Sequence, residues 1–529
     1  MKIAMTGASG NMGREALAQT LELPFAEFVR VLLSPKKKNN KLAKKLKKKY
    51  KNRIQIVRGS VADADACKRL VEGVDYVLHM AAVIPPASDA SFARSKECNL
   101  DGAITLVNAI KAAPVQPKYI HISTVALYGN RNELHPWGRV GDPLLVSPFD
   151  AYALHKLEGE RYALEAGLDC WVVLRQTAML HPNMMNDNVS DGLMYHTALN
   201  APLEWTSSRD SGYLIKRIFE REEKNEIPSF WKKIYNIGAG FKGRETGYDS
   251  FGDGFGIIGG SAEKFFKPNW FAARNFHGLW FADGDELEKL FGYQRDDVHE
   301  YWKEIGRHHK IFALGKCVPK GLIHAFLFGK LLKHPNSPLQ WVKSRDDARV
   351  QAYFGGYEEY AKIPSEWKDV KLMARGDFGD YDEMRNAEIA KERGRLLDHG
   401  YDESKPVDAW TAEDYASAAS FRGGEYLSGT QSDTNDKAEW KSFSETPCGA
   451  YDKARWRCSE GHEFTLTPFT VLRGGHWCPE CAPMPWKFDL LAKKSPFYAQ
   501  VWYDSHGREE NCVYEMNENG RAAVTEARE

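Results

Sequence analysis

The chain has 529 residues, of which 72 are basic and 72 acidic, so its formal net charge is zero. At about 150 residues per domain this length predicts two to four domains. Its hydrophobic content of 43% and aromatic content of 12% exclude global disorder, and its balanced charge argues against a role as a nucleic-acid coat. Thirteen of the fifteen tryptophans follow residue 200, and four of the nine cysteines lie between Cys448 and Cys481. The front and the back of the chain therefore differ in character.

The chain opens with a pattern typical of a strand, a glycine-rich turn and a helix. Ile3–Met5 is a short apolar segment, and three glycines spaced by three residues follow it. In dinucleotide-binding proteins these glycines allow the tight turn, the approach of the pyrophosphate and the close packing of the helix, whose N-terminus attracts phosphate. The residues expected to bind a cofactor here are Gly7, Ser9, Gly10, Asn11, Met12 and Gly13.

Strands and helices alternate as far as residue 174. This alternation predicts a parallel sheet with right-handed crossover helices. The expected fold class is α/β, a Rossmann-type doubly wound parallel sheet, followed by an aromatic-rich α+β region and a small C-terminal zinc ribbon. The strand-like segments are 28–33, 53–58, 74–80, 119–123 and 171–174, and the helical ones are 14–23, 66–72, 101–112 and 152–166.

The residues after the second predicted strand bear on the choice of cofactor. An NAD site places an acidic residue there to accept from the adenosine ribose. This chain has Ser34 instead, and then eleven basic residues and no acidic one from Lys36 to Arg53. Ser34 and Lys36 are expected to hold a 2′-phosphate, so NADP(H) is favoured over NAD(H). Two alternatives stay open: a solvated basic helix with an apolar stripe that includes Leu42 and Leu46, and attraction to nucleic acid or anionic lipid.

Tyr152 and Lys156 lie four residues apart in a predicted helix, so their side chains share one face. An ammonium placed there can stabilise a phenolate and lower the phenol pKa from its free value of about 10. The strand that ends at Thr124 can bring a hydroxyl beside the tyrosine to orient a carbonyl or an alcohol. The Tyr–Lys pair alone is also compatible with an ordinary helix surface. Together with the glycine turn, the three residues predict acid–base catalysis of hydride transfer.

With these motifs the first 240 residues resemble the extended short-chain dehydrogenases/reductases, often labelled NAD-dependent epimerases/dehydratases. The resemblance implies that Tyr152 is the general acid/base, that Lys156 is its partner and a ribose ligand, and that Thr124 orients the substrate. It also implies that Ser60, Val61, Ala81, Ala82, Asn99 and Gln176 lie in or beside the cofactor site. The segments that carry it are Thr6–Gly13, His79–Ala82, Asn99–Gly102, Ser123–Gly129, Tyr152–Lys156, Leu174–Thr177, Ser208–Gly212 and Tyr235–Gly238.

Two departures from the family pattern are informative. The segment that contacts adenine has Ser60 in place of the usual aspartate, and Asp63 is expected to cap a helix instead. Sugar-nucleotide dehydratases of the family follow the catalytic threonine with an Asp-Glu pair, whereas Thr124 is followed by Val125 and Ala126, so dehydration is not expected. A reductase or dehydrogenase is favoured. The alternatives are a nucleotide-sugar epimerase with tightly bound NAD(P) and, in another class, a non-catalytic NADP-sensing protein with a zinc-ribbon interaction module.

The region behind this domain is rich in glycine and aromatic residues. Gly238–Gly260 contains nine glycines and is expected to form either a mobile substrate loop or a surface loop. The aromatic stretch that follows, with Arg274 and His277, predicts either a substrate pocket or a packed core. Val318–Leu332 is expected to be a buried helix, with a helix on a membrane surface as the alternative.

Two close pairs of metal-ligand residues lie near the end of the chain, fifteen residues apart. They resemble a zinc-ribbon motif and predict one tetrahedral Zn²⁺ with a structural role, against the alternative of unligated side chains. Cys448 is a poorer candidate ligand, and His476 is an alternative to His462. The intervening Glu463–Leu472 alternates like a hairpin. The expected ligands are Cys458, His462, Cys478 and Cys481.

The expected partner is a small molecule, such as a sugar nucleotide or another carbonyl or alcohol. Nucleic acid is not expected, and a homodimer stays open. The chain begins directly with its first strand and contains no run of about 20 apolar residues, so we expect no leader, no membrane span and a cytoplasmic location. The expected domains are an NAD(P)-binding domain (1–245), a substrate-binding cap (246–365), a helical and linker region (366–447) and a zinc-ribbon-like domain (448–529).

Overall fold

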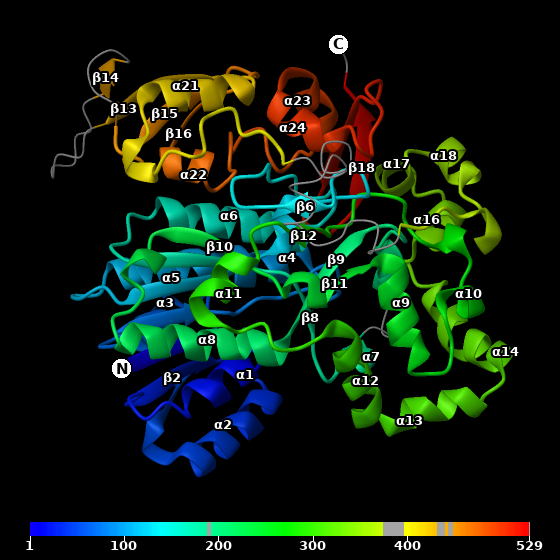
Figure 1. The fold of residues 1–529 in the computed structure, drawn as a ribbon, viewed down its shortest axis with the longest axis horizontal. Helices are drawn as coiled ribbons and strands as arrows, with labels where there is room; N and C mark the ends of the chain where they lie inside the picture. Colours follow the sequence, from blue (N-terminus) through cyan, green and yellow to red (C-terminus); the bar gives the residue numbers. More distant parts are fainter. Residues whose placement is uncertain (188–191, 374–395, 431–439, 443–447, 528–529) are drawn as a thin grey trace.

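The computed structural model describes residues 1–187, 192–373, 396–430, 440–442 and 448–527. Figure 1 shows a large parallel sheet between helices, a mainly helical cap beside it, and a C-terminal module that packs against one helix of the sheet. Among the described residues, none of the helices combines the length and apolar character that crossing a bilayer requires.

The large sheet has seven parallel strands in the order β10-β7-β5-β4-β1-β2-β3. The strand order reverses between β1 and β4, which is the switch point at which doubly wound sheets bind their ligands. This topology confirms the predicted α/β Rossmann-type fold. The strands are β1 Lys2–Thr6, β2 Phe28–Leu33, β3 Ile54–Arg58, β4 Tyr76–His79, β5 Lys118–Thr124, β7 Trp171–Gln176 and β10 Lys233–Ile237.

Helices cover both faces of this sheet, and each face has its own hydrophobic core. On one face α1 packs against α8, where Leu17, Leu214 and Ile218 are buried. On the other face α3, α5 and α6 bury residues such as Leu70 and Leu106. Neighbouring residues of β1 point to opposite cores, as alternation along a strand requires. These helices are α1 Asn11–Thr20, α3 Ala64–Val71, α5 Gly102–Lys111, α6 Ala151–Glu165 and α8 Ser208–Glu223.

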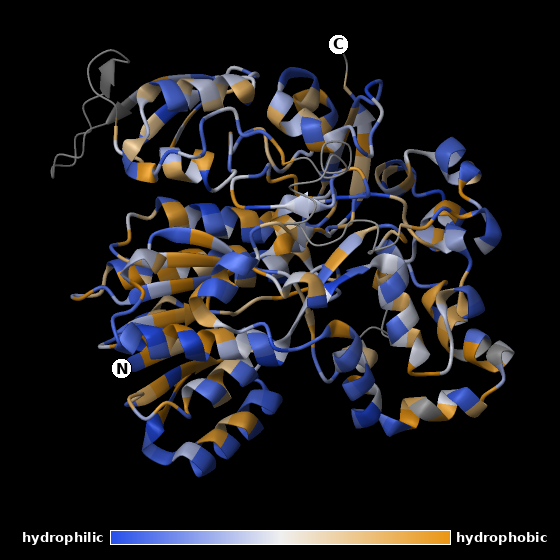
Figure 2. Ribbon diagram, in the orientation of Figure 1, coloured by the Kyte–Doolittle hydropathy of each residue, from blue (hydrophilic) through white to orange (hydrophobic). Residues whose placement is uncertain are grey.

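The basic segment after β2 forms the helix α2, Lys37–Tyr50. Most of its residues are hydrophilic (Figure 2), and its buried contacts to the first core come from Ala43 and Leu46, with Leu42 packed beside them. The predicted solvated basic helix with an apolar stripe is therefore confirmed. The same helix begins directly after Lys36, so this arrangement is also compatible with a phosphate contact at its N-terminal end.

The glycine-rich segment was expected to be a loop, and this expectation is wrong for Gly247–Gly256, which forms the helix α9. Thr246 and Asp249 form a capping box, in which each side chain accepts from the other residue's backbone N–H. This capping, together with the packing of Phe251, offsets the low helix propensity of glycine. Strands next to α9 form two small sheets: β8 Ala178–Leu180, β9 Pro202–Ser207 and β11 Arg244–Thr246, then β6 Trp137–Gly138 and β12 Trp280–Phe281.

The cap holds a third core, composed largely of aromatic side chains such as Phe266, Phe271 and Trp302. The packed-core interpretation therefore holds for most of the aromatic stretch. Lys320–Leu331 is helical, but burial is confirmed only at its end, because Phe328 is buried whereas Leu322 is 48% exposed. Helix α11, Asp285–Phe291, instead packs against α8 and β10 and buries Leu287 and Phe291 in the first core of the sheet. The cap helices are α10 Ala262–Phe265, α12 Val298–His308, α13 Lys310–Ala313, α14 Lys320–Ile323, α15 Gly329–Leu331, α16 Pro338–Ser344, α17 Asp347–Phe354 and α18 Tyr357–Lys362.

The C-terminal module shares one core with the region ahead of α6, where Phe149 meets Trp486 and Tyr514. The predicted hairpin within Glu463–Leu472 is wrong, because only 463–466 is a strand and Pro468 begins a helix. Parts of the predicted linker region, 374–395, 431–439 and 443–447, lie outside the described residues. The elements are α21 Ala412–Phe421, β13 Glu425–Thr430, β14 Trp440–Ser442, β15 Ala454–Arg457, β16 Glu463–Leu466, α22 Pro468–Leu472, α23 Phe488–Lys494, α24 Pro496–Trp502, β17 Cys512–Met516 and β18 Ala522–Glu526.

Candidate active site and metal site

The carboxyl ends of the central strands bring the candidate cofactor and catalytic residues to one edge of the sheet. Thr6, the last residue of β1, is in register with His79 at the end of β4, and Thr124 is in register with Gln176 at the ends of β5 and β7. The Gln176 side chain accepts from the Ser211 hydroxyl at 3.0 Å. In an open α/β sheet this edge is where ligands bind.

The glycine turn after β1 has the backbone geometry that its sequence predicts. Gly7 has a φ of +72°, and a Cβ there would lie 2.5 Å from the Met80 carbonyl carbon. A Cβ on Gly13 would lie 2.2 Å from the Gly7 carbonyl oxygen, so α1 starts in direct contact with the turn. The Thr6 hydroxyl accepts from the backbone N–H of Met80 and Ala81 at 3.1 Å, which fixes the loop after β4 beside the turn.

The N-terminus of α1 fits a bound anion. Gly10 is its N-cap and supplies no capping side chain, and the first turn of α1 has no acidic residue. The amide groups of Asn11 and Met12 therefore lack a side-chain cap, which is the arrangement that a helix offers to phosphate. Ser9 and Asn11 are partly exposed at this turn. These residues fit a dinucleotide pyrophosphate.

The residues expected around the adenosine lie at the ends of β2 and β3. Ser34 follows β2, and its hydroxyl accepts from the Asn39 side chain at 2.9 Å, while Lys36 is exposed. Ser60 follows β3, and Val61 next to it is buried. Asp63 caps α3 by accepting from two backbone amides, as predicted.

Asn99 fixes the loop that contains Ala81 and Ala82. Its side chain accepts from the backbone N–H of Val83 at 2.8 Å and donates to the carbonyl of the same residue at 2.9 Å. A Cβ on Gly159 of α6 would lie 2.9 Å from the Asn99 carbonyl oxygen. Asn99 therefore lies between the cofactor loop and the candidate catalytic helix, as the resemblance implies.

Thr124, Tyr152 and Lys156 come together where β5 ends and α6 begins. The Thr124 hydroxyl lies close enough to the Tyr152 phenol to lower its pKa, and the Lys156 ammonium donates to the carbonyl of Ile122, at 2.6 Å. Asp150 is the N-cap of α6 and accepts from the Ala153 N–H, at 2.8 Å. A hydroxyl, a phenol and a buried lysine at one strand end can orient a hydroxyl or carbonyl group and exchange a proton with it.

The expectation that Lys156 lowers the Tyr152 pKa is wrong in this structure. Burial raises the pKa of Tyr152 to about 12, although the Thr124 side chain opposes the shift. Burial also lowers the pKa of Lys156 to about 8, and the negative charge of Glu160 partly offsets this effect. The tyrosine is therefore a protonated acid at neutral pH.

A cavity of about 70 Å³ lies beside the start of α6. Its wall combines Ser147 and Asp150 with Arg349 of α17 and Met516 of β17. His277 also lies in this wall, and its Nδ1 is 3.1 Å from Asp150 Oδ2. His277 therefore fits the alternative prediction that the aromatic stretch lines a pocket.

Arg274, by contrast, pairs with Glu510 at 2.6 Å. Sequence reasoning missed Asp150 and Arg349 because their only signal is spatial.

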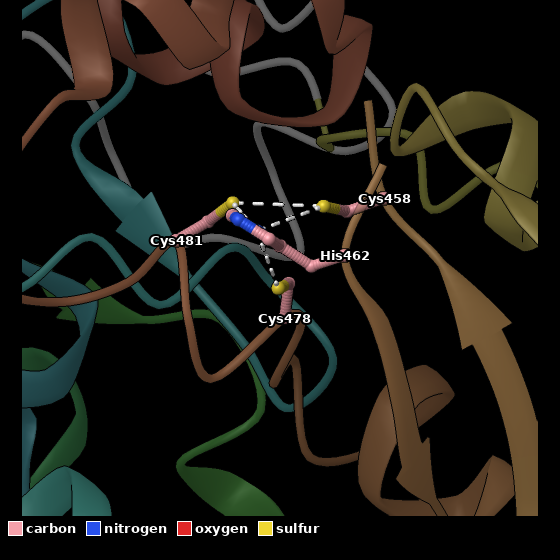
Figure 3. Close-up of side chains that lie close together, drawn as sticks. All are labelled: Cys458, His462, Cys478 and Cys481. Atoms are coloured by element: carbon pink, nitrogen blue, oxygen red, sulfur yellow. Dashed lines mark hydrogen bonds between the residues drawn. The ribbon is translucent and has the colours of Figure 1, made fainter. Parts of the chain in front are cut away.

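The four predicted metal ligands converge at the turn between β15 and β16 (Figure 3). Cys458 Sγ is 3.6 Å from Cys481 Sγ, and His462 Nδ1 lies 3.2 to 3.7 Å from the three sulfur atoms. Ligands on a tetrahedral zinc are about 3.8 Å apart for two sulfurs and about 3.5 Å apart for sulfur and nitrogen. The donor set and its spacing therefore fit Zn²⁺.

The hydrogen bond between Cys478 and Cys481 lowers the pKa of Cys478 and raises that of Cys481, and burial raises the pKa of Cys458. His476 does not replace His462, because its Nε2 is 3.1 Å from Glu160. Cys448 is engaged elsewhere, with the Tyr426 hydroxyl at 3.6 Å.

The glycine turn yields a test with a matched pair of variants. We expect Gly13→Ala to lower stability by about 1–3 kcal/mol, because the added Cβ meets backbone that cannot swing away. Gly10→Ala, at an ordinary φ of −75°, places its Cβ 3.3 Å from the Gly7 carbonyl oxygen, a tight contact but a much milder one, so its unfolding midpoint should fall less than that of Gly13→Ala. Thermal unfolding of both variants measures this, and equal midpoints would contradict the described contact between α1 and the turn.

Partial relatives among curated proteins include a dehydrogenase and a trifunctional enzyme. D-erythronate dehydrogenase from Cupriavidus necator is 27% identical over 139 residues, which cover 25% of this chain and 42% of that protein. A trifunctional UDP-glucose 4,6-dehydratase/UDP-4-keto-6-deoxy-D-glucose 3,5-epimerase/UDP-4-keto-L-rhamnose-reductase from Arabidopsis thaliana is 29% identical over 136 residues, covering 25% of this chain and 20% of that one. The chain thus spans less than half the length of these relatives.

Solved structures with a similar fold include a dTDP-glucose 4,6-dehydratase variant from Streptomyces venezuelae, with 22% identity, coverage of 59% of this chain and 97% of that chain, and a TM-score of 0.47. A UDP-glucuronic acid 4-epimerase variant from Bacillus cereus has 21% identity, coverage of 59% and 99%, and a TM-score of 0.46. Residues 3–194, about a third of the chain, match the model of the NAD dependent epimerase/dehydratase family. This match supports the assignment of the N-terminal domain to that family.

Proposed function

We propose that this protein is a nicotinamide-dependent oxidoreductase of the extended short-chain dehydrogenase/reductase type, which transfers hydride to or from a carbon that carries oxygen. The observation that carries the proposal is the meeting of Thr124, Tyr152 and Lys156 at the end of β5, at the same sheet edge as the glycine turn of β1. A binding protein without chemistry needs a phosphate cradle, but it needs neither a buried lysine nor a buried phenol on the same helix. This argues for an enzyme over the alternative of a non-catalytic NADP sensor.

Each of the three side chains has a role that follows from its position. When bound, the nicotinamide supplies the site that accepts or donates hydride. Tyr152, protonated at neutral pH, donates its proton to the substrate oxygen during reduction and takes a proton back during oxidation. Thr124 holds the same oxygen, and Lys156 adds positive charge that stabilises the phenolate and a donor for the ribose.

The substrate in this proposal is a small alcohol or carbonyl compound. The cavity beside α6 is small, at about 70 Å³, and its polar lining includes Asp150, His277 and Arg349. Curated relatives include a dehydrogenase named for a sugar acid and an enzyme named for sugar nucleotides. A nucleotide-sugar epimerase with tightly bound NAD(P) therefore remains the second candidate. Dehydration is disfavoured by Val125 and Ala126, which follow Thr124 where an acid pair would be needed.

The cofactor in this proposal is NADP(H) in preference to NAD(H). Ser34 and Lys36 stand where an NAD site would carry a carboxylate, and Lys36 is exposed at the start of α2. A 2′-phosphate there would gain a charge-assisted contact with the lysine and an N-terminal helix dipole.

We also propose that Cys458, His462, Cys478 and Cys481 bind one structural Zn²⁺. All four positions of a tetrahedral site are filled by protein side chains, so the site has no open position for substrate. The metal would hold the turn of the β15–β16 hairpin against the segment that leads into α23.

The role of Tyr152 can be tested by Tyr152→Phe. We expect kcat/KM to fall by at least about 100-fold, because the proton donor is lost, while cofactor affinity is retained. Tyr162→Phe on the same helix is the control, since its hydroxyl bonds Asn108. Assays follow nicotinamide absorbance with sugar acids and sugar nucleotides, and an epimerase would instead interconvert substrates with no net absorbance change. Full activity of Tyr152→Phe would refute the assignment.

Cofactor preference can be tested by Lys36→Glu. The new carboxylate should repel a 2′-phosphate and accept from a free ribose, so the ratio of NADPH to NADH affinity should fall by at least about tenfold, or 1.4 kcal/mol. Lys47→Glu, in the last turn of α2, is the matched charge control. Fluorescence titration with both cofactors measures the ratio. A wild-type protein that binds NADH more tightly would contradict the proposal.

The metal site predicts about one zinc per chain in protein purified without added metal, measured by elemental analysis. Cys478→Ser should lose the metal and lower the unfolding temperature. Cys512→Ser, at a buried cysteine outside the cluster, should keep it. Zinc content well below one half per wild-type chain would contradict the proposal.

A further inference from the structure

A buried ion pair lies one helical turn beyond Lys156. Glu160 of α6 and Arg175 of β7 are both fully buried, and Arg175 Nη2 donates to Glu160 Oε1 at 2.6 Å. A second bond joins Arg175 Nε to Glu160 Oε2 at 3.2 Å. Arg175 also donates to the hydroxyl of Tyr128, at 2.8 Å, in the turn that follows Thr124. The pair therefore connects α6, β7 and the segment after β5, which are the elements around the candidate catalytic residues.

Two groups from the C-terminal module complete this pair. His476 Nε2 donates to Glu160 Oε1 at 3.1 Å, and the carbonyl of Gly474 accepts from Arg175 Nη2 at 2.6 Å. Each member of the pair thus gains one partner from residues about 300 positions later in the chain. Burial opposes the ionisation of Glu160, yet Arg175 and His476 keep its pKa below the usual range.

The loop that supplies these partners is fixed at both ends. A Cβ on Gly475 would lie 2.2 Å from the Asp142 carbonyl oxygen, and its φ is +73°, so the backbone rests directly on the Rossmann domain. Trp477 packs against Phe464 of β16, with ring centroids 5.1 Å apart. The next residue is Cys478, one of the four candidate metal ligands. The metal cluster and the contacts to Glu160 and Arg175 are therefore separated by a few residues of well-packed chain.

The module also holds the far end of the same helix. Glu165, the last residue of α6, accepts from the backbone N–H and the hydroxyl of Thr467 at 3.0 and 2.9 Å. Its carboxylate also accepts from Lys453, at 2.6 Å. These contacts place the module along the back of α6, whose first turn carries Tyr152 (Figure 1).

We propose that residues 474–477 act as a clamp on the catalytic helix, in which His476 is a positioning residue that holds Glu160 and, through it, Tyr152 and Lys156. The inference deepens the proposed function and rests on it for the meaning of "catalytic". According to this proposal, the C-terminal module helps to position the active-site residues. It does so through one hydrogen bond donated to the buried Glu160 carboxylate and one accepted from the buried Arg175 guanidinium.

Loss of this one hydrogen bond is expected to have a large effect on the position of α6. A buried carboxylate that loses a hydrogen-bond partner is left with poorly compensated charge, and α6 can respond by shifting. The Lys156 ammonium lies one turn away and makes a single 2.6 Å bond to β5. A displacement of about 1 Å at a reacting group is enough to reduce rates by about 100-fold.

The test compares His476→Leu with His476→Gln in the full-length, metal-loaded protein. Leucine removes the donor, whereas the glutamine amide can still donate to Glu160, so only leucine should disturb the helix. Three quantities are measured: zinc per chain by elemental analysis, amide hydrogen exchange of residues 151–165, and NADPH affinity by fluorescence. For His476→Leu we expect unchanged zinc content, faster exchange in α6 and NADPH affinity reduced by at least about tenfold. His476→Gln should keep both the exchange rate in α6 and the NADPH affinity near their wild-type values.

Arg457→Ala is the control within the module. Arg457 pairs with Glu425 and Glu463 on the hairpin surface, so its loss should leave α6 exchange unchanged. If His476→Leu does not fold, His476→Ala provides the same comparison, because alanine also lacks a donor, and it should speed exchange in 151–165. Unchanged exchange in α6 in either variant would overturn the clamp. Failure of the wild type to bind any nicotinamide cofactor would instead overturn the proposed function, since exchange in α6 reports on the clamp independently.

Discussion

One buried carboxylate–guanidinium pair fixes how the parts of this molecule meet. Glu160 and Arg175 carry full charges into the interior, where an ion is tolerated only if its hydrogen-bonding capacity is used. Their partners come from Tyr128, Gly474 and His476. This requirement is directional, unlike the apolar contacts around it. It sets the register between α6, β7 and the C-terminal module, whereas hydrophobic packing alone tolerates small displacements.

The shared core and the Cys–His cluster are the two features that hold the C-terminal region together. Trp456, Trp486 and their neighbours join the residues ahead of α6 in one continuous core, so the module does not need to fold around its own interior. The cluster lies at the turn of the short β15–β16 hairpin, and its three cysteines are members of the same core. The proposed zinc would add directional bonds to this apolar packing.

Short-range patterns made most of the Rossmann domain predictable. Gly13 lies within a few residues of the Gly7 backbone that it touches, and Tyr152 and Lys156 share one helix, so spacing alone was sufficient. The helix over Gly247–Gly256 escaped prediction because its stability comes from a capping box and aromatic packing that override propensity. The pKa of Tyr152 and the partners of Glu160 could not be inferred, since burial and contacts 316 residues apart leave no trace in local sequence. The cluster of Cys458, His462, Cys478 and Cys481 was predictable because each close pair lies on one short turn of the chain.

The distance along the chain between Glu160 and His476 has a consequence for synthesis. Chains emerge from the ribosome N-terminus first, and domains usually fold as they appear. Here every strand of the large sheet is complete by Ile237, yet the last partner of its buried charges is made 239 residues later. During synthesis, the sheet can therefore be complete while Glu160 and Arg175 still lack their partners Gly474 and His476. Molecules truncated before residue 474 would share this incomplete interior, because they lack both Gly474 and His476.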